Sequence, residues 1–160
     1  MKKYFENDKN WQQFKEILFS WEGTPYRHMQ MVKGRGADCT LFVGAVWKEV
    51  GLLKDVVFEY YDPKWCFKTK EERVLKSIFQ HSQYYAKEGV VLTRHKKDEP
   101  LFRGDLVVFA TTRTGLTNHA GVYLGENKII HAVPKRGVST YTINDSWRER
   151  MTAFFRVEVL

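Results

Sequence analysis

A cysteine follows an aspartate at the start of an apolar stretch of the sequence. Asp38 suits the N-cap of a helix, and Cys39 would then lie in the first turn. Free backbone N–H groups and the positive end of the helix dipole stabilise a thiolate there, and the thiolate is the reactive form of cysteine. We therefore expect Cys39 to be a nucleophile. The alternative is that Cys39 is a small buried hydrophobic residue, as free cysteines often are.

A nucleophilic cysteine needs a base within hydrogen-bonding distance and a third group that orients the base. Two of the five histidines, His119 and His131, fall on predicted strands and are the candidates for these roles. Gly121 lies on the same strand face as His119, where its small size would leave room for another chain or a substrate. The other three histidines fall in a loop, on a helix and in a basic polar segment, and we expect exposed or packing roles for His28, His81 and His95.

The strand register decides whether His131 can orient His119. A plain four-residue loop at 125–128 would pair Leu124 with Ile129 and would place the two histidines on opposite faces of the sheet. If His131 is the third group, the hairpin must have an odd loop, such as three residues with a bulge. We predict this odd geometry, and a regular even loop would exclude His131 from the site.

The second cysteine, Cys66, lies between Trp65 and Phe67 and has no capping signal, so we expect packing or pocket lining rather than chemistry. Two cysteines and two histidines could bind zinc, but the sequence has no closely spaced ligand pair such as C-x-x-C. It also has no glycine-rich phosphate loop and no G-x-S-x-G motif. Zinc is a lesser alternative to a site without metal or cofactor.

The elements that position these residues follow from the spacing of apolar side chains. This spacing predicts a helix over 10–21, a buried helix over 39–50, and a third helix over 69–87 with a polar outer face. Short runs rich in Val, Ile, Tyr and Phe then predict an antiparallel meander of five strands, at 105–110, 119–124, 128–133, 138–143 and 152–159. Helices followed by strands indicate an α+β domain.

Length and composition limit the possible classes of protein. The 160 residues fit a single domain spanning 1–160, and 43% hydrophobic with 15% aromatic residues suffice for a packed core, which excludes intrinsic disorder. No apolar run approaches the roughly 20 residues of a membrane span, and residues 1–14 are too polar for a signal peptide. We expect a chain made in the cytoplasm without a signal peptide, with free thiols.

The chain is basic, with 26 Lys and Arg against 19 Asp and Glu and a formal net charge of +7. Nucleic acid, a membrane surface or an anionic cell-wall polymer would each match this charge. The basic residues are interspersed with acidic ones over most of the chain, so they could equally serve only to keep the domain soluble.

Five segments, taken in order, resemble the NlpC-type cell-wall cysteine peptidases, and this resemblance covers the whole chain. They are WEGTPY at 21–26, ADCTLFV at 37–43, GDLVVF at 104–109, HAGVYLG at 119–125 and IHA at 130–132. Further features resemble the short phage-tail and gene-transfer-agent members of that family, namely GTPYRH at 23–28, VKG at 32–34, YxPxW at 61–65 and Glu72-Arg73.

The resemblance implies a papain-like α+β fold in which N-terminal helices pack on a five- to six-stranded antiparallel sheet. It also implies the roles of three residues. Cys39 would attack an amide carbonyl, His119 would activate the thiol and later protonate the leaving amine, and His131 would hold the imidazole.

The resemblance further implies substrate or oxyanion residues beside the nucleophile. These are Tyr26, which matches a family tyrosine, together with Asp38 and Thr40, and the backbone N–H of Cys39 is an oxyanion donor. Without the family, Tyr26 could equally be a packing aromatic after a turn. The family usually has Ser and Gly after the cysteine, whereas this chain has Thr40 and Leu41, so we expect a reshaped substrate pocket.

Members of the family cut stem peptides of peptidoglycan, often between D-glutamate and a diamino acid. We therefore expect a thiol hydrolase with peptidoglycan peptides as substrate, no cofactor, no membrane span, and a basic surface matched to the anionic wall rather than to a specific nucleic acid. Phage-tail members lack secretion signals because the particle delivers them, which implies phage-tail-like particle proteins as partners.

Two other classes of function compete with the hydrolase. One is an amidase or lipid acyltransferase on the same scaffold, and the acyltransferase would need a long apolar channel. The other is a non-catalytic particle protein, in which Cys39 and His119 would lie too far apart to meet.

Overall fold

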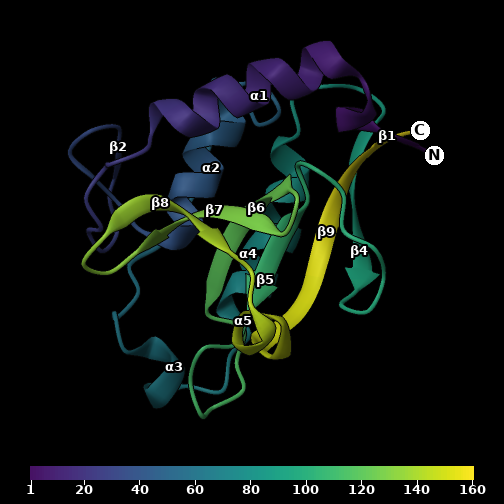
Figure 1. Ribbon diagram of the computed structural model, residues 1–160. Helices are drawn as coiled ribbons and strands as arrows, with labels where there is room; N and C mark the ends of the chain where they lie inside the picture. Colours follow the sequence, from purple (N-terminus) through teal and green to yellow (C-terminus); the bar gives the residue numbers. More distant parts are fainter.

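The computed structural model describes residues 1–160, and Figure 1 shows its helices packed around one large sheet. The α-helices are α1 (Asp8–Ser20), α2 (Cys39–Glu49), α3 (Trp65–Lys68), α4 (Arg73–Gln80) and α5 (Asp145–Arg150), with short 3-10 helices at Tyr4–Glu6 and His81–Tyr84. The strands are β1 (Lys2–Lys3), β2 (Met31–Val32), β3 (Gly36–Ala37), β4 (Val90–Lys96), β5 (Leu106–Phe109), β6 (His119–Gly125), β7 (Lys128–Val133), β8 (Gly137–Thr142) and β9 (Met151–Val159).

Helix α1 forms where apolar residues recur at three- and four-residue steps, as predicted. Asn7 caps it, because the Asn7 side chain accepts a hydrogen bond from the Asn10 N–H at 3.1 Å. The buried face of α1 carries Trp11, Phe14 and Leu18. Figure 1 shows α1 lying across one end of α2, against which it packs. Helix α1 therefore shields part of α2 from solvent.

Helix α2 is the buried helix predicted from Cys39 onward. Its residues are apolar on nearly every side, and seven of its eleven residues are buried. It packs against β6 and β7 of the sheet. This packing carries Cys39, the first residue of α2, to the start of β6.

Seven antiparallel strands form the large sheet in the order β1-β9-β5-β6-β7-β8, with β4 on the other side of β9. The predicted meander accounts for β5 to β8, but β9 crosses back to pair with β5 instead of β8. The sheet has seven strands rather than the expected five to six, because the short β1 and the edge strand β4 both add to the long β9. The predicted α+β class, with helices packed on an antiparallel sheet, is confirmed.

The chain between α2 and β5 differs most from the prediction. The helix expected over 69–87 begins only at Arg73, and after Gln80 the backbone tightens into a 3-10 turn. The basic polar segment around His95, for which no strand was predicted, is the edge strand β4. The His95 ring stacks on Phe154 with centroids 5.1 Å apart. Edge strands often carry charged side chains. These interrupt the alternation of apolar and polar residues by which a strand is usually predicted.

Apolar side chains cover both faces of the sheet. A core of 27 buried residues joins the helices to one face and includes Phe14, Phe42 and Val108. A smaller core of six buried residues, including Phe109 and Phe154, lies on the other face. Trp147 of α5 packs against this smaller core. Because residues alternate along β6, His119 belongs to the side of the smaller core, whereas Ala120 belongs to the side of α2.

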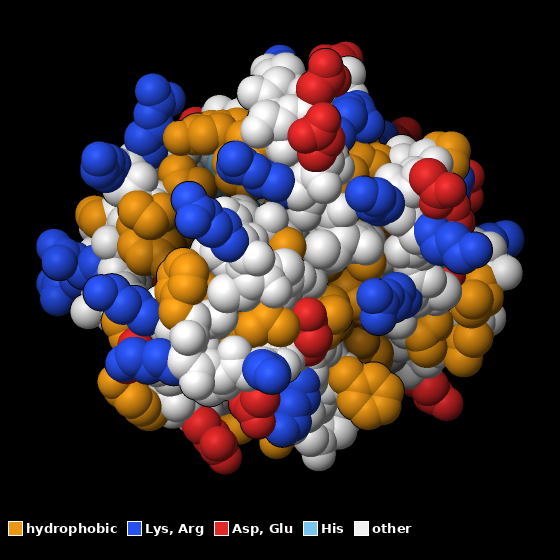
Figure 2. Space-filling model, turned by 90° about the horizontal axis from the view of Figure 1, so that it is seen from below, with side chains coloured by type: hydrophobic (Ala, Val, Ile, Leu, Met, Phe, Trp, Pro, Cys, Tyr) orange, Lys and Arg blue, Asp and Glu red, His pale blue; other side chains and the backbone are white.

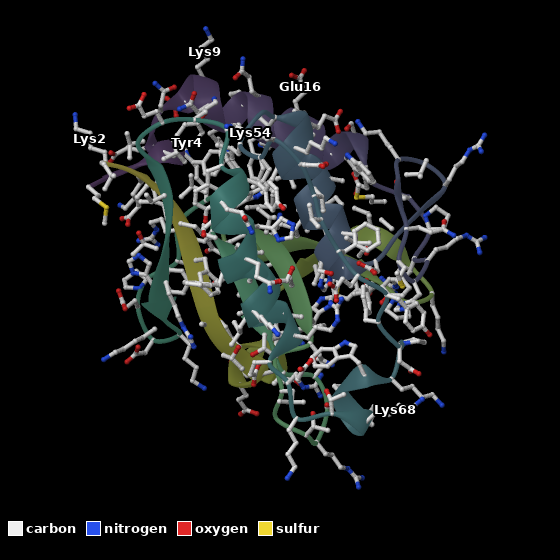
Figure 3. The ribbon with its side chains drawn as sticks, turned by 180° about the vertical axis from the view of Figure 1, so that it is seen from behind. Lys2, Tyr4, Lys9, Glu16, Lys54 and Lys68 are labelled. Atoms are coloured by element: carbon white, nitrogen blue, oxygen red, sulfur yellow. The ribbon has the colours of Figure 1, made fainter.

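Charged side chains are distributed over the surface. On the face seen in Figure 2, lysines and arginines are spread among hydrophobic and acidic side chains rather than gathered into one patch. From behind, in Figure 3, Lys9 and Glu16 point outward from α1. Some lysines are paired with acidic neighbours, as Lys33 is with Glu49 at 2.6 Å. None of the helices combines the length and the apolar character needed to cross a bilayer.

Candidate active site

Cys39 is the first residue of α2, and Asp38 is its N-cap as predicted. The Asp38 backbone is extended, and its carboxylate accepts the Leu41 N–H at 2.9 Å. Cys39 is buried, and its Sγ lies 3.8 Å from the carbonyl oxygen of Asn118. The thiol therefore lies where the N-terminus of α2 meets the residue that precedes β6.

The ionisation of Cys39 differs from the expectation for a helix N-terminus. Burial, and secondly the charge of Asp38, raise the pKa of Cys39 to about 12. The backbone N–H groups of Ala120, Thr40 and Cys39 oppose this rise, but desolvation outweighs them. Burial therefore favours the neutral thiol in the free protein, against the helix N-terminus, and a base is needed to activate Cys39. The role of Cys39 as the nucleophile stays a prediction.

His119 and His131 lie on one face of the sheet, as the role of His131 in orienting His119 requires. Nε2 of His119 lies 2.8 Å from Nδ1 of His131. A bulge in β6 shifts the pairing of β6 and β7 before the turn, and this brings His131 opposite Gly121. The bulge is confirmed, but the loop of three residues is wrong. The turn has two residues, Glu126 and Asn127, both in the left-handed backbone conformation that suits a tight hairpin.

Gly121 leaves space for His131. A Cβ atom at Gly121 would lie 3.1 Å from Cβ of His131 and 3.2 Å from the carbonyl oxygen of Ile130. Both distances are tighter than most Cβ contacts in proteins. The space beside His119 that was expected for another chain or a substrate is therefore filled by the neighbouring strand of the same sheet.

Aromatic rings enclose the two histidines. The Trp147 ring lies 5.7 Å from that of His119 and 5.3 Å from that of His131, while Phe109 and Tyr141 close other sides. Burial is the main reason that the pKa of His119 falls to about 3 and that of His131 to about 4, and the nearby His131 lowers the pKa of His119 further. Both imidazoles are therefore neutral near pH 7.

A cleft of about 200 Å³ opens beside the thiol. Its lining is mainly polar, and it brings together five of the six predicted site residues. These five are Tyr26, Asp38, Cys39, Thr40 and His119. The sixth, His131, does not line the cleft, because it is fully buried behind His119.

The carboxylate of Asp38 is occupied by the protein itself. It accepts the backbone N–H groups of Leu41 and Met29, each at 2.9 Å, and the hydroxyls of Thr40 and Tyr61. Asp38 is also buried, which raises its pKa above the usual value although these N–H donors oppose the rise. We therefore assign Asp38 to holding the start of α2, and its contact with substrate stays a prediction.

Tyr26 and Thr40 differ in how free their hydroxyls are. Tyr26 is half-buried in the cleft, its backbone pairs with Ala37, and its hydroxyl makes no hydrogen bond within the protein. Burial, with the charges of Cys39 and Asp38, raises the pKa of Tyr26 well above its usual value, so the hydroxyl stays a donor. The Thr40 hydroxyl already donates to Asp38 at 3.3 Å. Tyr26 is therefore the freer donor in the cleft.

Three residues of the site had no predicted role. Tyr61 and Arg73 line the cleft from the irregular connection and from the start of α4, and Trp147 covers the histidines from α5. Tyr61 and Arg73 belong to segments that carry the family resemblance, but the sequence alone assigns them no chemistry. The sequence does contain a helix-start signal for α5, namely Asn144 at the N-cap position. In the structure the Asn144 side chain accepts the Trp147 N–H at 2.9 Å.

The other candidate groups have packing roles. Cys66 is buried and lines the cleft, as predicted, with its Sγ 4.0 Å from the Thr112 hydroxyl. His28 donates from Nε2 to the Tyr61 carbonyl oxygen at 2.6 Å. No group of three or more His, Cys, Asp or Glu side chains is arranged to hold a metal ion.

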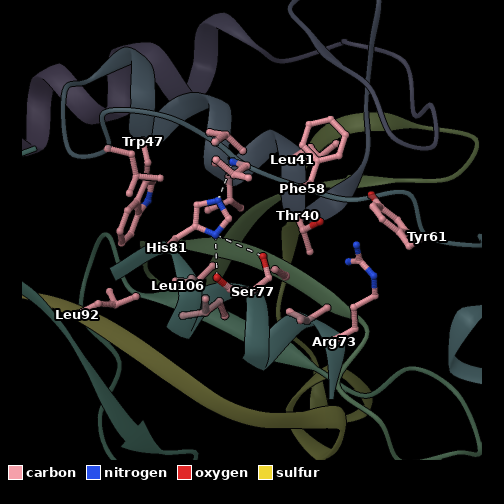
Figure 4. A pocket seen from close by; sticks show the side chains of 18 of the residues that line it. Thr40, Leu41, Trp47, Phe58, Tyr61, Arg73, Ser77, His81, Leu92 and Leu106 are labelled. Atoms are coloured by element: carbon pink, nitrogen blue, oxygen red, sulfur yellow. Dashed lines mark hydrogen bonds between the residues drawn. The ribbon is translucent and has the colours of Figure 1, made fainter. Parts of the chain in front are cut away.

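A second cavity, of about 80 Å³ and mostly apolar, lies next to the cleft behind Thr40 (Figure 4). Leu41 and Trp47 of α2 contribute to its wall. The cleft and the cavity share four lining residues, Thr40, Tyr61, Arg73 and Val74. The cavity is therefore bordered by Thr40 and Leu41. These are the two residues that replace the Ser and Gly expected from the family resemblance.

Comparison with known proteins identifies the family. The profile of the NlpC/P60 family matches residues 19–156. The chain belongs to the NlpC/P60 family. The matched residues include Cys39, His119 and His131, together with α2 and strands β5 to β8.

Two relatives and one solved structure are similar to this NlpC/P60 chain. It is 29% identical over 133 residues to the probable endopeptidase NlpC of Escherichia coli, covering 83% of this chain and 68% of the relative. It is 28% identical over 138 residues to the murein DD-endopeptidase MepS/murein LD-carboxypeptidase of Escherichia coli, covering 86% of this chain but only 57% of that longer protein. The crystal structure of the NlpC/p60 domain of the peptidoglycan hydrolase SagA has the same fold, with a TM-score of 0.56, 19% identity, and coverage of 93% and 98%.

Proposed function

We propose that this protein is a thiol hydrolase that cleaves amide bonds in the stem peptides of peptidoglycan. The observation that carries the proposal is the joint position of Cys39 and His119 on one cleft, with His131 hydrogen-bonded behind His119. A thiol, a base and a group that orients the base are the parts that amide cleavage by cysteine requires.

The first step starts from the neutral resting state. For His119 to accept a proton at Nδ1, its Nε2 carries the ring hydrogen and donates it to Nδ1 of His131 at 2.8 Å. The ring hydrogen of His131 then lies on its own Nε2, an atom that has no hydrogen-bond partner in the protein. When substrate enters, the thiol leaves the Asn118 carbonyl and gives its proton to His119 as the sulfur attacks the amide carbon.

The remaining steps use the same groups. The tetrahedral oxyanion forms beside the N-terminus of α2, where the Cys39 N–H and the Tyr26 hydroxyl are the donors we assign to it. Protonated His119 passes its proton to the leaving amine, and a thioester remains on Cys39. Water, deprotonated by His119, then hydrolyses the thioester and restores the thiol. Protein groups and water suffice for every step.

We further propose that the bond cleaved joins D-glutamate to a diamino acid. The polar cleft lining and the family resemblance at 21–26 and 37–43 support this choice. Peptidoglycan as substrate is also supported by the relatives, which are described as a murein endopeptidase and a peptidoglycan hydrolase. Because the chain corresponds to 57% of MepS, a different bond within the stem peptide is the main competing outcome.

The competing functions find less support. A lipid acyltransferase needs a long apolar channel at its nucleophile, but the apolar cavity has a volume of only about 80 Å³ and neither Cys39 nor His119 lines it. A non-catalytic protein would have its cysteine and histidine apart, whereas both line one cleft. The hydrolase is therefore the function that the geometry supports best.

Synthetic stem peptides test the bond assignment. We expect the wild type to cut a tetrapeptide that contains γ-linked D-glutamate into two pieces, one of which begins with the diamino acid. Mass spectrometry identifies the new amine on that piece. Release of the terminal D-alanine alone would contradict the D-glutamyl assignment. A muropeptide substrate tests the amidase. If the bond between the lactyl group of the sugar and the peptide were cut, releasing the whole peptide, the protein would be an amidase.

We also propose that a phage-tail-like particle carries the enzyme to the wall, which the resemblance at 23–28 and 61–65 supports. Particles purified from the source organism should contain the protein by peptide mass spectrometry. Its presence only in the soluble cell extract, with none in the particles, would contradict this route.

A further inference from the structure

Arg73 occupies an unusual position at the boundary between the cleft and the apolar cavity. It is the first residue of α4, it is half-buried, and it lines both spaces. Its Cζ lies 3.7 Å from the centroid of the Tyr61 ring, and the Tyr61 hydroxyl donates to Asp38, which precedes the nucleophile. Figure 4 shows the guanidinium reaching from α4 toward Thr40 and Tyr61.

Most of the hydrogen-bonding capacity of Arg73 is unused. A guanidinium offers five N–H donors in a planar fork, and the protein takes one of them, from Nη2 to the Glu59 carbonyl oxygen at 3.2 Å. No carboxylate forms an ion pair with Arg73. Arg156 shows what a buried arginine of this protein otherwise does, since it forms two hydrogen bonds with Asp105, at 2.9 and 2.7 Å.

Negative charges act on Arg73 without pairing with it. The largest of these effects comes from Asp38, followed by Glu71 and Glu59. The carboxylate oxygens of Asp38 are already engaged by two backbone N–H groups and two hydroxyls. Burial lowers the pKa of Arg73 below its usual value, and the guanidinium nevertheless stays protonated near pH 7. A partly desolvated cation with a free fork faces the place where substrate binds.

The neighbouring cavity adds a second chemical requirement. Beyond Arg73 it is lined mainly by hydrophobic side chains, among them Leu41, Val74 and Ile78. At about 80 Å³ it is smaller than the ~150 Å³ apolar cavity that admits benzene, so it suits a short aliphatic group. A carboxylate carried on an aliphatic stem would match the arginine and the cavity together.

We propose that Arg73 is a specificity-determining residue that binds a free carboxylate of the substrate peptide, with the aliphatic stem of that carboxylate directed to the apolar cavity. This inference rests on the proposed function and adds the substrate feature that is recognised. Within a stem peptide the carboxylate has two possible sources, the α-carboxylate of γ-linked D-glutamate and the side-chain carboxylate of diaminopimelate. The remaining carboxylate, at the C-terminus, is amidated in every test peptide.

Four synthetic peptides separate these sources. Their glutamate carboxylate is free or amidated, and their diamino acid is diaminopimelate or lysine, which lacks the side-chain carboxylate. We expect wild-type kcat/KM to fall about 10- to 100-fold when the recognised carboxylate is removed, because a hydrogen-bonded charge pair of ~1.5–3 kcal/mol is lost. Arg73→Gln should lower kcat/KM to the same level on the peptide that carries the carboxylate, mainly through KM.

The controls distinguish recognition from a structural role. Arg73→Gln should lose much less activity on the peptide that has neither carboxylate than on the peptide that carries the recognised one. Arg73→Lys should recover part of the lost activity, because it restores the charge without the fork. Lys76→Gln removes an exposed charge from the same helix and should change nothing. Equal losses by Arg73→Gln on all four peptides, or no preference of the wild type among them, would overturn the inference.

Failure of the proposed function gives a different pattern. In that case the folded wild type would cleave none of the four peptides. Calorimetric binding of the same peptides to Cys39→Ala then decides the inference without catalysis. Weaker binding after loss of one carboxylate, abolished by adding Arg73→Gln, would support it, and equal binding of all four peptides would overturn it.

Discussion

At the residue scale, the resting site holds its thiol and its imidazole as neutral groups. Burial raises the pKa of Cys39 to about 12 and lowers that of His119 to about 3, so transfer of the proton between them is unfavourable before substrate binds. Ionisation must then accompany attack on the substrate. This differs from a resting thiolate–imidazolium pair, which the helix N-terminus alone would favour.

Alkylation of Cys39 tests the neutral resting state. Without substrate, we expect iodoacetamide to label Cys39 slowly at pH 7, with a rate that continues to rise above pH 9 because the thiolate forms only near its raised pKa. Peptide mass spectrometry after timed labelling gives the rate at Cys39 separately from that at Cys66. A labelling rate that is already maximal near pH 6 would indicate a thiolate and contradict the neutral pair.

The two histidines should differ in how much activity their loss removes. His119→Ala removes the group that moves protons, and we expect kcat to fall at least ~100-fold. His131→Ala should cost less, because His131 only positions the imidazole. His131→Asn should retain more activity than His131→Ala, since an amide oxygen can still accept the hydrogen of His119 Nε2. Steady-state kinetics on folded variants measures this order, and equal losses for His119→Ala and His131→Ala would refute the division of roles.

At the element scale, the β6–β7 hairpin sets the position of the histidine pair. The bulge in β6 places both side chains on one face, and Gly121 leaves the space that His131 fills. Helix α5 then covers the pair with Trp147. Three local features of backbone and sequence therefore determine one hydrogen bond.

Gly121→Ala tests the contribution of the hairpin. The new Cβ would lie 3.1 Å from Cβ of His131, so the histidine must shift by a few tenths of an ångström. We expect about a 10-fold loss of kcat with a small change in melting temperature, because misplacement of a catalytic group costs rate steeply. Ser139→Ala, on the strand at the other side of His131, adds no atoms and serves as the control. Wild-type kcat in Gly121→Ala would show that the hairpin does not set the position of the pair.

Elements with regular patterns could be predicted from the sequence. Helices α1 and α2 have apolar residues at helical spacing, and β5 to β9 have β-branched and aromatic runs between polar turns. Strand parity with a plain loop would have placed His119 and His131 on opposite faces, and their shared face depends on the bulge in β6. The order of the strands could not be predicted, because the pairing of β9 with β5 is a long-range choice that local patterns do not encode.

The parts of the site that could not be predicted depend on burial and on irregular chain. The direction of the pKa shift of Cys39 reverses because enclosure by β6 outweighs the helix dipole, and enclosure is not visible in the local sequence. Tyr61 reaches the cleft from an irregular connection and Arg73 reaches it from the start of α4. Their positions depend on how distant segments of the chain pack together rather than on local spacing.

At the scale of the whole molecule, the enclosed histidines couple folding to pH. Their pKa values in the folded protein, about 3 for His119 and about 4 for His131, lie below the ordinary value of 6.5. The unfolded chain therefore binds more protons between pH 6.5 and about 4, and stability is lost as the pH falls through this range. The raised pKa values of Asp38 and Asp105 act in the opposite direction at the acidic end.

Comparing the wild type with His131→Asn isolates the contribution of His131 to the pH dependence of stability. We expect the melting temperature of the wild type to fall more between pH 7 and pH 4.5 than that of His131→Asn, because the variant has one fewer buried histidine to protonate on unfolding. Both proteins keep Asp38 and Asp105, so the carboxylate effects cancel. Scanning calorimetry at both pH values measures the slopes, and a steeper fall in His131→Asn would contradict the buried neutral state.

The distribution of charge also belongs to this scale. Lysines and arginines are spread over the face seen in Figure 2, and some lysines of the protein are paired with acidic residues. Under the proposed function, such a surface would provide general attraction to an anionic wall, while Arg73 at the cleft would provide recognition of a particular group. Attraction and recognition thus come from different residues.

Digestion of purified peptidoglycan tests the central claim most directly. The wild type and Cys39→Ser are each incubated with intact peptidoglycan, and the soluble products are identified by mass spectrometry. We expect new stem-peptide fragments, with free amines at the cleaved bonds, from the wild type alone. Identical products from both proteins, or new glycan ends instead of peptide ends, would contradict the assignment of a thiol hydrolase.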